Sequence, residues 1–277
     1  MIKLLALDLD GTCLNWNNKI TLKTMAALKK AAQQGVEIVF ITGRSYASMP
    51  YQLKKEGFFR YVISSNGAVI TDRLENKVIF HSYIPLDTAL SVLKRAREMR
   101  LGLTAHIDNK HVLEGTKLKL LGKFLYGKDS NNAIRVTNII QYLEEKRERI
   151  EEIHLFYFCK DKRKMVNMLC REFPQLNTPQ GHFYVEMVTG ETTKGNALLW
   201  LTQKLGIAKQ EIACVGDGEN DIPMFEQAGV CYAVENAKKC LKHLADYIVP
   251  SNDKDGVSNV IKEVLEARSK NERKIQE

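Results

Sequence analysis

Short apolar runs alternate with amphipathic segments in the N-terminal part of the chain, and this order constrains the fold more than any other feature. Residues 3–7, 36–41 and 61–63 are apolar runs that read as buried strands. Residues 21–34 and 45–56, which separate them, have helix-like patterns. Strands that are apolar throughout and are separated by helices indicate a parallel sheet covered on both faces.

Polar residues follow each of these three strands. The first strand is followed by Asp8-Leu9-Asp10-Gly11-Thr12, the second by Thr42-Gly43-Arg44, and the third by Asn66-Gly67. Ligands bind beyond the carboxyl ends of the strands in sheets of this kind. We therefore expect the functional site at this edge of the sheet.

Two acidic clusters predict a divalent cation there. Asp8 and Asp10 lie two residues apart at a sharp turn, so both carboxylates can be directed into one crevice. A second cluster follows a later strand, where Asp217 and Asp221 lie four residues apart in a loop with two glycines. Like charges this close require a cation or a shared proton, and hard oxygen ligands favour Mg²⁺.

A hydroxyl and a lysine complement the carboxylates. Thr42 ends a strand, where its hydroxyl can donate to a phosphoryl oxygen, and Lys194 can neutralise charge that develops during phosphoryl transfer. Each residue alone is also explained as an ordinary exposed side chain. Their order relative to the acidic clusters favours the functional interpretation.

The middle of the chain has a different pattern. Its strands alternate more and its helices are heavily charged, which predicts an open sheet with helices on one face. The parallel pattern returns after Lys194. We therefore predict a parallel-sheet core formed by residues 1–82 and 189–277, with an α+β domain of residues 83–188 inserted into it.

These motifs resemble, in order, the four motifs of haloacid dehalogenase superfamily phosphatases. The motifs are Asp8 to Thr12, Thr42 to Arg44, Lys194-Gly195, and Gly216 to Asp221. The Cof-type group, with an α/β cap inserted between its second and third motifs, is the most similar. Residues 251–257 also resemble that group, whereas the usual Pro and Gly before the lysine are replaced by Thr189-Gly190-Glu191-Thr192-Thr193.

The resemblance implies a Rossmann-like α/β core and catalysis through an aspartyl phosphate. Asp8 would be the nucleophile, and Asp10 would protonate the leaving oxygen and then activate water. Mg²⁺ would be held by the Asp8 carboxylate, the Asp10 carbonyl and Asp217, with support from Asp221.

The remaining motif residues would bind the substrate. Thr42, Lys194 and Asn220 would hold the phosphoryl group, and Arg44 and Asn66 are candidates for further substrate contact. For the latter two, a surface ion pair and a turn residue are equally good explanations.

The expected function is therefore a Mg²⁺-dependent phosphatase for a small phosphorylated metabolite, namely a sugar phosphate, a phosphorylated cofactor or a nucleotide. A phosphomutase using the same intermediate stays open. The net charge of +8 also allows a nucleic-acid or anionic-surface binding protein, but the basic stretches alternate with acids and lack a recognition motif. We expect no nucleic-acid partner.

Apolar runs are too short to span a membrane, and Asp8 interrupts the N-terminal one, so we expect neither a span nor a secretory signal. The six cysteines contain no C-x-x-C pair, which favours reduced thiols. We therefore expect a cytoplasmic monomer or homodimer.

Overall fold

The computed structural model describes residues 1–157, 159–181 and 183–276, which fold into two compact units. The first unit contains residues 1–43, 52–79 and 193–277, and the second contains residues 44–51 and 80–192. The second unit thus includes residues 44–51, 80–82 and 189–192, which the sequence pattern assigns to the core. A contact between residues distant in the chain holds residues 44–51 there, because the Ala47 N–H donates to the Asn109 carbonyl at 2.9 Å.

The first unit is built on an eight-stranded sheet. In spatial order its strands are β14 (Tyr247–Val249), β13 (Val230–Val234), β12 (Ile212–Gly216), β1 (Leu4–Asp8), β2 (Glu37–Ile41), β3 (Tyr61–Ser64), β4 (Val69–Asp72) and β5 (Lys77–His81). The six strands from β14 to β3 are parallel, and β4 is antiparallel to β3. All five residues of β1 are buried, as expected for a central strand with helices on both faces.

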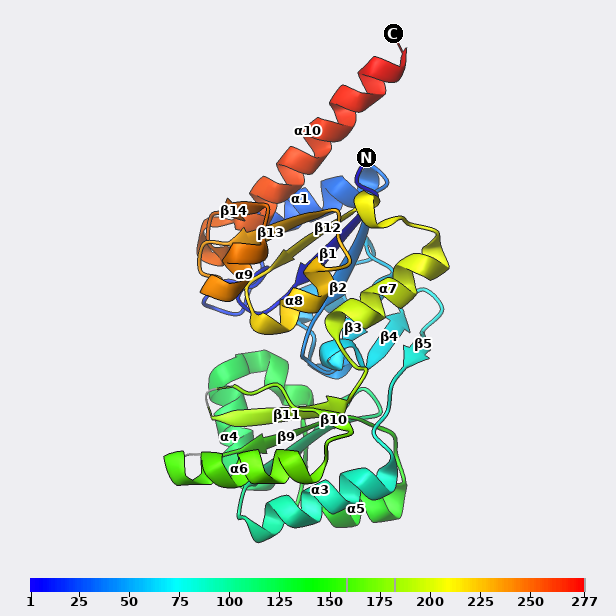
Figure 1. The fold of residues 1–277 in the computed structure, drawn as a ribbon. Helices are drawn as coiled ribbons and strands as arrows, with labels where there is room; N and C mark the ends of the chain where they lie inside the picture. Colours follow the sequence, from blue (N-terminus) through cyan, green and yellow to red (C-terminus); the bar gives the residue numbers. More distant parts are fainter. Residues whose placement is uncertain (158, 182, 277) are drawn as a thin grey trace. The chain divides into compact units, whose positions relative to one another are not determined.

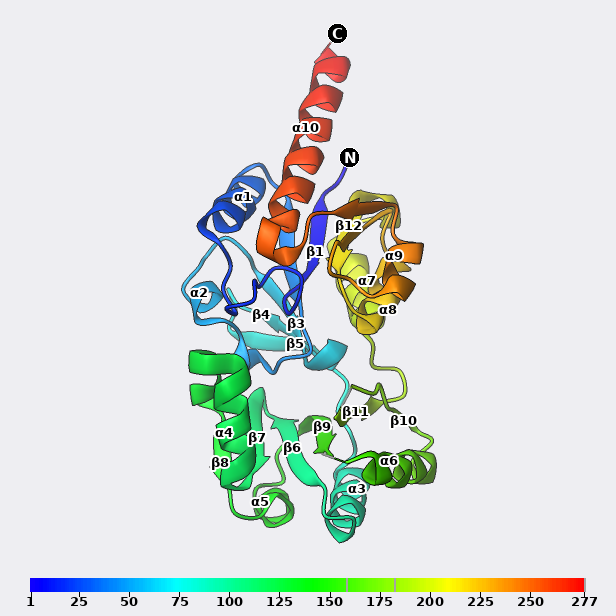
Figure 2. The same ribbon diagram turned by 90° about the vertical axis from the view of Figure 1, so that its left-hand side faces the viewer.

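Helices cover both faces of this sheet, as Figures 1 and 2 show. The helices α1 (Leu22–Gln33) and α10 (Gly256–Gln276) pack together on one face. The other face carries α7 (Lys194–Leu205), α8 (Ile222–Phe225) and α9 (Lys239–Leu244). The predicted α/β class with a parallel-sheet core is confirmed.

One predicted helix is wrong. Residues 45–56 form a 3₁₀ turn at Tyr46–Ser48 and only one short helix, α2 (Tyr51–Lys54). Pro50 explains the interruption, because proline disfavours helical backbone in the residue before it. Met49 accordingly has ψ 148°, far from a helical value.

The second unit contains a six-stranded sheet and four helices. Its strands, in spatial order, are β10 (Leu176–Asn177), β11 (Tyr184–Thr189), β9 (Ile150–Phe156), β6 (Gly102–Ile107), β7 (Lys110–Glu114) and β8 (Ile134–Val136). Its helices are α3 (Leu86–Glu98), α4 (Gly115–Tyr126), α5 (Ile139–Lys146) and α6 (Lys160–Glu172). The pairings are antiparallel except for the parallel pair β7 and β8.

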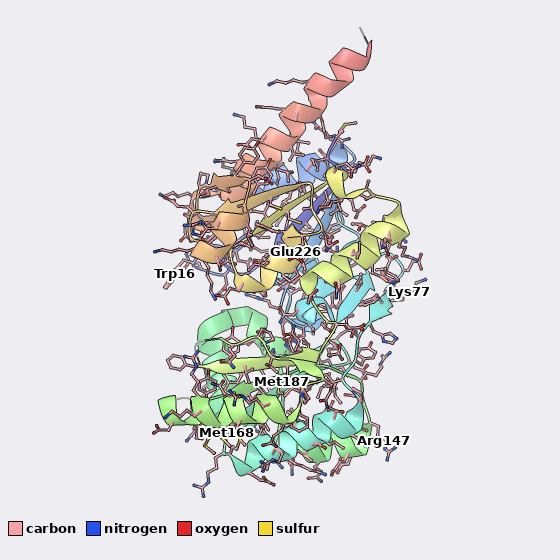
Figure 3. All side chains as sticks on the ribbon, viewed as in Figure 1. Trp16, Lys77, Arg147, Met168, Met187 and Glu226 are labelled. Carbon is pink, nitrogen blue, oxygen red and sulfur yellow. The ribbon has the colours of Figure 1, made fainter. Side chains whose placement is uncertain are left out.

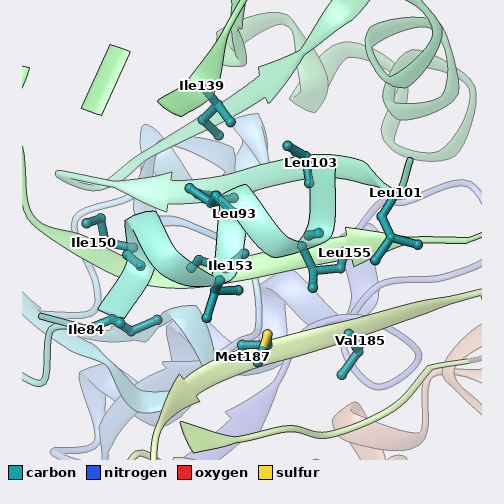
Figure 4. Close-up of a cluster of buried hydrophobic side chains, with 14 of the residues drawn as sticks. Ile84, Leu93, Leu101, Leu103, Ile139, Ile150, Ile153, Leu155, Val185 and Met187 are labelled. Carbon is teal, nitrogen blue, oxygen red and sulfur yellow. The ribbon is translucent and has the colours of Figure 1, made fainter. Parts of the chain in front are cut away.

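One face of this second sheet forms the unit's hydrophobic core. Alternate residues of β6 and β9, such as Leu103 and Ile153, pack with Leu93 of α3 and Ile139 of α5 (Figure 4). Met187 of β11 joins them, whereas Met168, on the outer side of α6, is 63% exposed (Figure 3). The opposite face therefore carries the other set of alternate residues, which are more polar.

Among the described residues, none of the helices combines the length and the apolar character that crossing a bilayer requires.

Candidate active site

The parallel register brings the predicted motifs to one edge of the first sheet. Asp8, the last residue of β1, is aligned with Ile41, so Thr42 follows immediately on the neighbouring strand. On the other side Leu7 is aligned with Val215, so Asp217 follows one residue beyond the end of β12. Asp8 and Thr42 are buried, at 4% and 0% exposed.

Lys194 lies among these carboxylates. Its Nζ donates to Asp8 Oδ1 at 2.6 Å and to Asp221 Oδ1 at 2.7 Å, and the side chain is 1% exposed. Burial lowers the pKa of Lys194, but the carboxylates of Asp221 and Asp8 outweigh burial and raise it above the ordinary value. The lysine is therefore a fixed positive charge next to Asp8.

Two glycines position this lysine at the first turn of α7. A Cβ at Gly67 would lie 2.2 Å from the Thr193 carbonyl oxygen, and Gly67 also has φ +104°. A Cβ at Gly195 would lie 2.1 Å from the Pro223 carbonyl oxygen. Only glycine permits both approaches, which seat the start of α7 between the loop after β3 and the start of α8.

Asp221 and Asp217 differ in what surrounds them. Asp221 Oδ2 accepts hydrogen bonds from the backbone N–H groups of Asp217 and Gly218, both at 2.9 Å, while Oδ1 accepts from Lys194. Asp221 therefore fixes the loop after β12. Among the residues that the structure describes, Asp217 Oδ1 accepts one long bond, from the Thr12 hydroxyl at 3.5 Å, and its Oδ2 would lie 2.3 Å from a Cβ at Gly11.

The site is short of positive charge. Burial raises the pKa of Asp8 well above its ordinary value, although Lys194 opposes this. Burial and then the charge of Asp221 raise the pKa of Asp217 to about 7. One lysine cannot neutralise three neighbouring carboxylates, so both acids resist ionisation.

These residues fit a divalent cation. Oxygens of Asp8, Asp217 and Asp221 lie within 4.8 Å of one another. Asp8 Oδ2 is buried and has no hydrogen-bond partner among the residues that the structure describes. A buried, unsatisfied carboxylate oxygen requires a partner, and a hard oxygen-binding cation such as Mg²⁺ supplies both that partner and the missing charge.

Further predicted residues line the same edge. Asn220 Nδ2 donates to Asn66 Oδ1 at 3.1 Å, and the Asn66 N–H donates to the Thr42 carbonyl at 3.1 Å, so three loops are linked. Asn66 has φ +52° and is 5% exposed. Asp10 is half-buried two residues after Asp8, and its charge contributes to the raised pKa of Asp217.

Arg44 is the predicted residue that the structure does not place in this unit. It belongs to the second unit, where its Nη1 donates to the Ser48 carbonyl at 3.3 Å. Its side chain is 6% exposed.

Sequence reasoning missed some supporting residues. The sequence pattern gives Thr12 no role beyond its motif, and it does not point to Asn236, whose Nδ2 donates to the Gly11 carbonyl at 2.7 Å. Residues 251–257, to which the pattern assigns no role, hold the loop after β1. Asp253 accepts from the Trp16 N–H at 2.8 Å, and Asn252 donates to the Leu14 carbonyl at 2.7 Å.

The chain belongs to a known family. A family model described as haloacid dehalogenase-like hydrolase matches residues 5–261, which is nearly the whole chain. The protein is therefore an enzyme of the haloacid dehalogenase-like hydrolase family.

Named relatives agree with this class. A phosphatase of Bacillus subtilis, YwpJ, is 29% identical, and the match covers 95% of this chain and 100% of that protein. Another B. subtilis protein, named as the 5-amino-6-(5-phospho-D-ribitylamino)uracil phosphatase YwtE, is 26% identical over 95% of this chain and 98% of its own.

Solved structures show the same fold. TM0651 of Thermotoga maritima has a TM-score of 0.81 at 28% identity, over 95% of this chain and 97% of that one. A haloacid dehalogenase-like hydrolase of B. subtilis has a TM-score of 0.84 at 26% identity, over 94% and 99%.

Proposed function

We propose that this enzyme is a Mg²⁺-dependent phosphatase that hydrolyses a small phosphorylated metabolite through an aspartyl phosphate. The observation that carries the proposal is the Asp8 carboxylate. One of its oxygens is held by Lys194 at 2.6 Å, and the other is buried without a partner among the described residues. Phosphatase names among the relatives support the same reaction class.

Asp8, Asp217 and the main-chain carbonyl of Asp10 are the groups that we assign to Mg²⁺. When bound, the ion would neutralise the carboxylates and the phosphoryl oxygens. Asp221 has a supporting position, because its two oxygens already accept bonds from Lys194 and from two backbone N–H groups.

Asp8 is the nucleophile in this proposal. A carboxylate oxygen of Asp8 forms a bond to phosphorus as the bond from phosphorus to the alcohol oxygen of the substrate breaks. Asp10 gives its proton to that departing oxygen and, as a carboxylate, then takes a proton from water. The water oxygen attacks phosphorus, so phosphate leaves and Asp8 is restored.

Lys194, Thr42 and Asn220 are assigned to the phosphoryl group. Phosphoryl transfer depends mainly on positioning and charge neutralisation. Lys194 supplies fixed charge, because the Asp8 and Asp221 carboxylates hold its Nζ in place. Asn220 Nδ2 donates to Asn66 Oδ1 at 3.1 Å, and this hydrogen bond orients the Asn220 amide.

We assign the choice of substrate to the inserted segment 83–188, acting as a cap domain. The groups gathered around Asp8 suit a cation and a phosphoryl group. Because every phosphate ester carries a phosphoryl group, these residues do not select among the alcohols to which the phosphate is attached. The curated relative YwtE is named for a phosphorylated ribitylaminouracil. Sugar phosphates, phosphorylated cofactors and nucleotides are the corresponding classes to test, with the enzyme expected as a cytoplasmic monomer or homodimer.

The test is phosphate release from a panel of these esters with and without Mg²⁺. The expected result is Mg²⁺-dependent release that falls by at least about a thousandfold in Asp8→Asn, since the variant lacks the nucleophile. Asp246→Asn is the matched control. Asp246 is an exposed carboxylate that accepts a hydrogen bond from the Cys231 N–H. It precedes β14, so it lies at the amino ends of the parallel strands, whereas Asp8 lies at their carboxyl ends.

Equal release by wild type and Asp8→Asn would contradict the proposal, as would activity that is indifferent to Mg²⁺. An isomerised sugar phosphate without free phosphate would identify a phosphomutase instead.

A further inference from the structure

The second unit contains a cluster of histidines that the proposed reaction does not use. His106 on β6, His111 on β7 and His154 on β9 are neighbours across the sheet, since His106 is aligned with His111 and Thr104 with His154. They lie on the face opposite the hydrophobic core, because Leu103, Ala105, Val112 and Ile153 belong to that core. Three strands that are neighbours in the sheet thus each bring one histidine to the same part of the polar face.

The three imidazoles have the arrangement of a metal site. Each offers one ring nitrogen, and the three nitrogens lie within 4.8 Å of one another. The rings of His106 and His111 are inclined at 87°, those of His106 and His154 at 86°, and those of His111 and His154 at 88°. Three mutually perpendicular rings around a common point can surround an ion without stacking on one another.

Two of the three histidines are buried, and this argues against an ordinary polar surface. His106 is 3% exposed and His154 is 8% exposed, while His111 is half-buried. Nε2 of His111 is buried and has no hydrogen-bond partner among the described residues. Leaving a buried ring nitrogen unsatisfied costs free energy, so a ligand that accepts its lone pair is favoured.

Glu152 lies next to two of the rings. One of its oxygens, Oε2, lies 3.2 Å from His106 Nδ1 and 3.4 Å from His154 Nε2. Metal-bound histidines commonly donate their other ring N–H to a carboxylate, which fixes the tautomer and the ring orientation. His154 and Glu152 also form a second group with Glu186, whose ligand atoms lie within 4.8 Å of one another.

We propose that His106, His111 and His154 bind a transition-metal ion of the Zn²⁺ class, with Glu152 as the carboxylate that orients the rings. Imidazole ligands suit Zn²⁺, Co²⁺, Ni²⁺ and Cu²⁺, and not Mg²⁺. Three histidines leave a fourth tetrahedral position for water or another ligand.

Burial lowers the pKa of His106 and of His111, which favours the neutral rings that a metal requires, whereas the charge of Glu152 outweighs burial and raises the pKa of His154. Binding would draw the nitrogens together from separations of up to 4.8 Å, because Zn–N bonds of 2.0–2.1 Å place tetrahedral nitrogens about 3.3 Å apart. The Thr104 hydroxyl, 3.2 Å from His154 Nδ1, would have to turn away.

This site is independent of the proposed phosphatase reaction, and the experiment separates the two. The full chain is titrated with Zn²⁺ in a large excess of Mg²⁺, in the Asp217→Asn background, so that binding to the aspartate site is suppressed. The expected result is one equivalent of tightly bound Zn²⁺ and an increase in the thermal midpoint. Co²⁺ in its place is expected to give the strong visible absorption of a tetrahedral site.

His111→Gln and His106→Gln are expected to weaken Zn²⁺ binding by at least about a hundredfold, since loss of a supporting group alone costs 10- to 100-fold. His243→Gln is the matched control, because His243 is an exposed histidine on α9 of the other unit. A circular-dichroism melt without metal shows whether each variant folds. Wild type that retains no Zn²⁺ would overturn the proposal, and so would Zn²⁺ binding that folded His111→Gln leaves unchanged.

Discussion

Asp217 and Asp221 show how two identical side chains acquire different tasks. Asp221 is fully buried and accepts three hydrogen bonds, from Lys194 and from the backbone N–H groups of Asp217 and Gly218. From the described part of the chain, the Asp217 carboxylate accepts one long bond, from the Thr12 hydroxyl. Asp217 is therefore the carboxylate with capacity left for a cation, and Asp221 stabilises the loop that presents it.

This difference predicts an unusual pH dependence for Asp217→Asn. The pKa of Asp217 is raised to about 7, so its folded-state pKa exceeds the unfolded one and the folded protein prefers the protonated form. The stabilisation that comes from the protonated form is complete at pH values below the pKa of Asp217 in the unfolded state, and it is lost as pH rises through about 7. In EDTA, Asp217→Asn should therefore unfold at a higher temperature than wild type at pH 8, with little difference at pH 4.

Thermal unfolding of both proteins at the two pH values measures this. Asp246→Asn, in which an exposed carboxylate is neutralised, should show no such pH-dependent gain. A wild-type midpoint above that of Asp217→Asn at pH 8 without metal would contradict the electrostatic argument.

Sequence patterns identified many of the site residues, but not what each of them contacts. The carboxylates, Lys194 and Thr42 were identified by residue type, by position after strands and by resemblance. Which aspartate is saturated by hydrogen bonds depends on the path of the loop after β12, and no spacing rule specifies that path. The roles of Thr12 and Asn236 were missed for the same reason, because their partners Asp217 and Gly11 lie far away in the chain.

At the scale of elements, the close approach of the loop after β3 to the start of α7 places Lys194. Gly67 combines φ +104° with a Cβ position only 2.2 Å from the Thr193 carbonyl oxygen. Thr193 is also the N-cap of α7, and its hydroxyl accepts a bond from the Asn196 N–H. The geometry of the active lysine thus depends on contact between two elements.

Gly67→Ala should therefore destabilise the protein by about 3 kcal/mol or more and reduce activity, because it adds a steric clash to the cost of a positive φ. Gly206→Ala separates the two contributions. Gly206 also has a positive φ, +64°, but a Cβ there would meet nothing within 4 Å. It should cost only about 1–2 kcal/mol and leave activity intact. Equal losses in urea unfolding would show that the Thr193 contact is not decisive.

A second element-scale feature is a set of three hydroxyls close to the segment that precedes Lys194. The hydroxyls of Ser82, Thr189 and Thr192 form a triangle, with separations of 2.6, 2.7 and 2.9 Å. The triangle joins the segment that leads into the second unit to the segment that leads out of it, both within that unit.

Thr192→Val should lower the free energy of unfolding by about 0.5–1.5 kcal/mol, because it removes hydrogen bonds to the half-buried hydroxyls of Ser82 and Thr189. A double-mutant cycle with Ser82→Ala should give a coupling of about 0.5–3 kcal/mol. Ser91→Ala is the control, since the exposed Ser91 hydroxyl bonds only within α3, and it should change stability by less than about 0.5 kcal/mol. Additive effects of the two triangle variants would contradict this account.

At the scale of the whole molecule, the chain divides two kinds of chemistry between two units. The first unit gathers carboxylates and one lysine at the edge of a parallel sheet, and the second gathers imidazoles on the face of a mixed sheet. Hard oxygen ligands and softer nitrogen ligands prefer different cations.

Mg²⁺ should therefore stabilise the protein through the aspartates alone. At a concentration a hundredfold above its dissociation constant, a ligand of the folded state adds about 2.7 kcal/mol. Wild type and Asp246→Asn should show this increase in a thermal scan at pH 8, and Asp217→Asn should lose it. An undiminished Mg²⁺ shift in Asp217→Asn would place the ion elsewhere.

The α/β class and the residue types at the ends of the strands follow from the sequence alone, and the position of the insertion between the second and third motifs stays a prediction. These properties are local, since hydrophobic periodicity, turn-forming residues and short motifs specify them. Only the tertiary structure decided that Asp221 is saturated, that Gly67 seats Lys194, that residues 44–51 join the second unit, and that three histidines meet on one sheet face. Each of these depends on contacts between residues distant in the chain, and strand register and loop path bring such residues together only after folding.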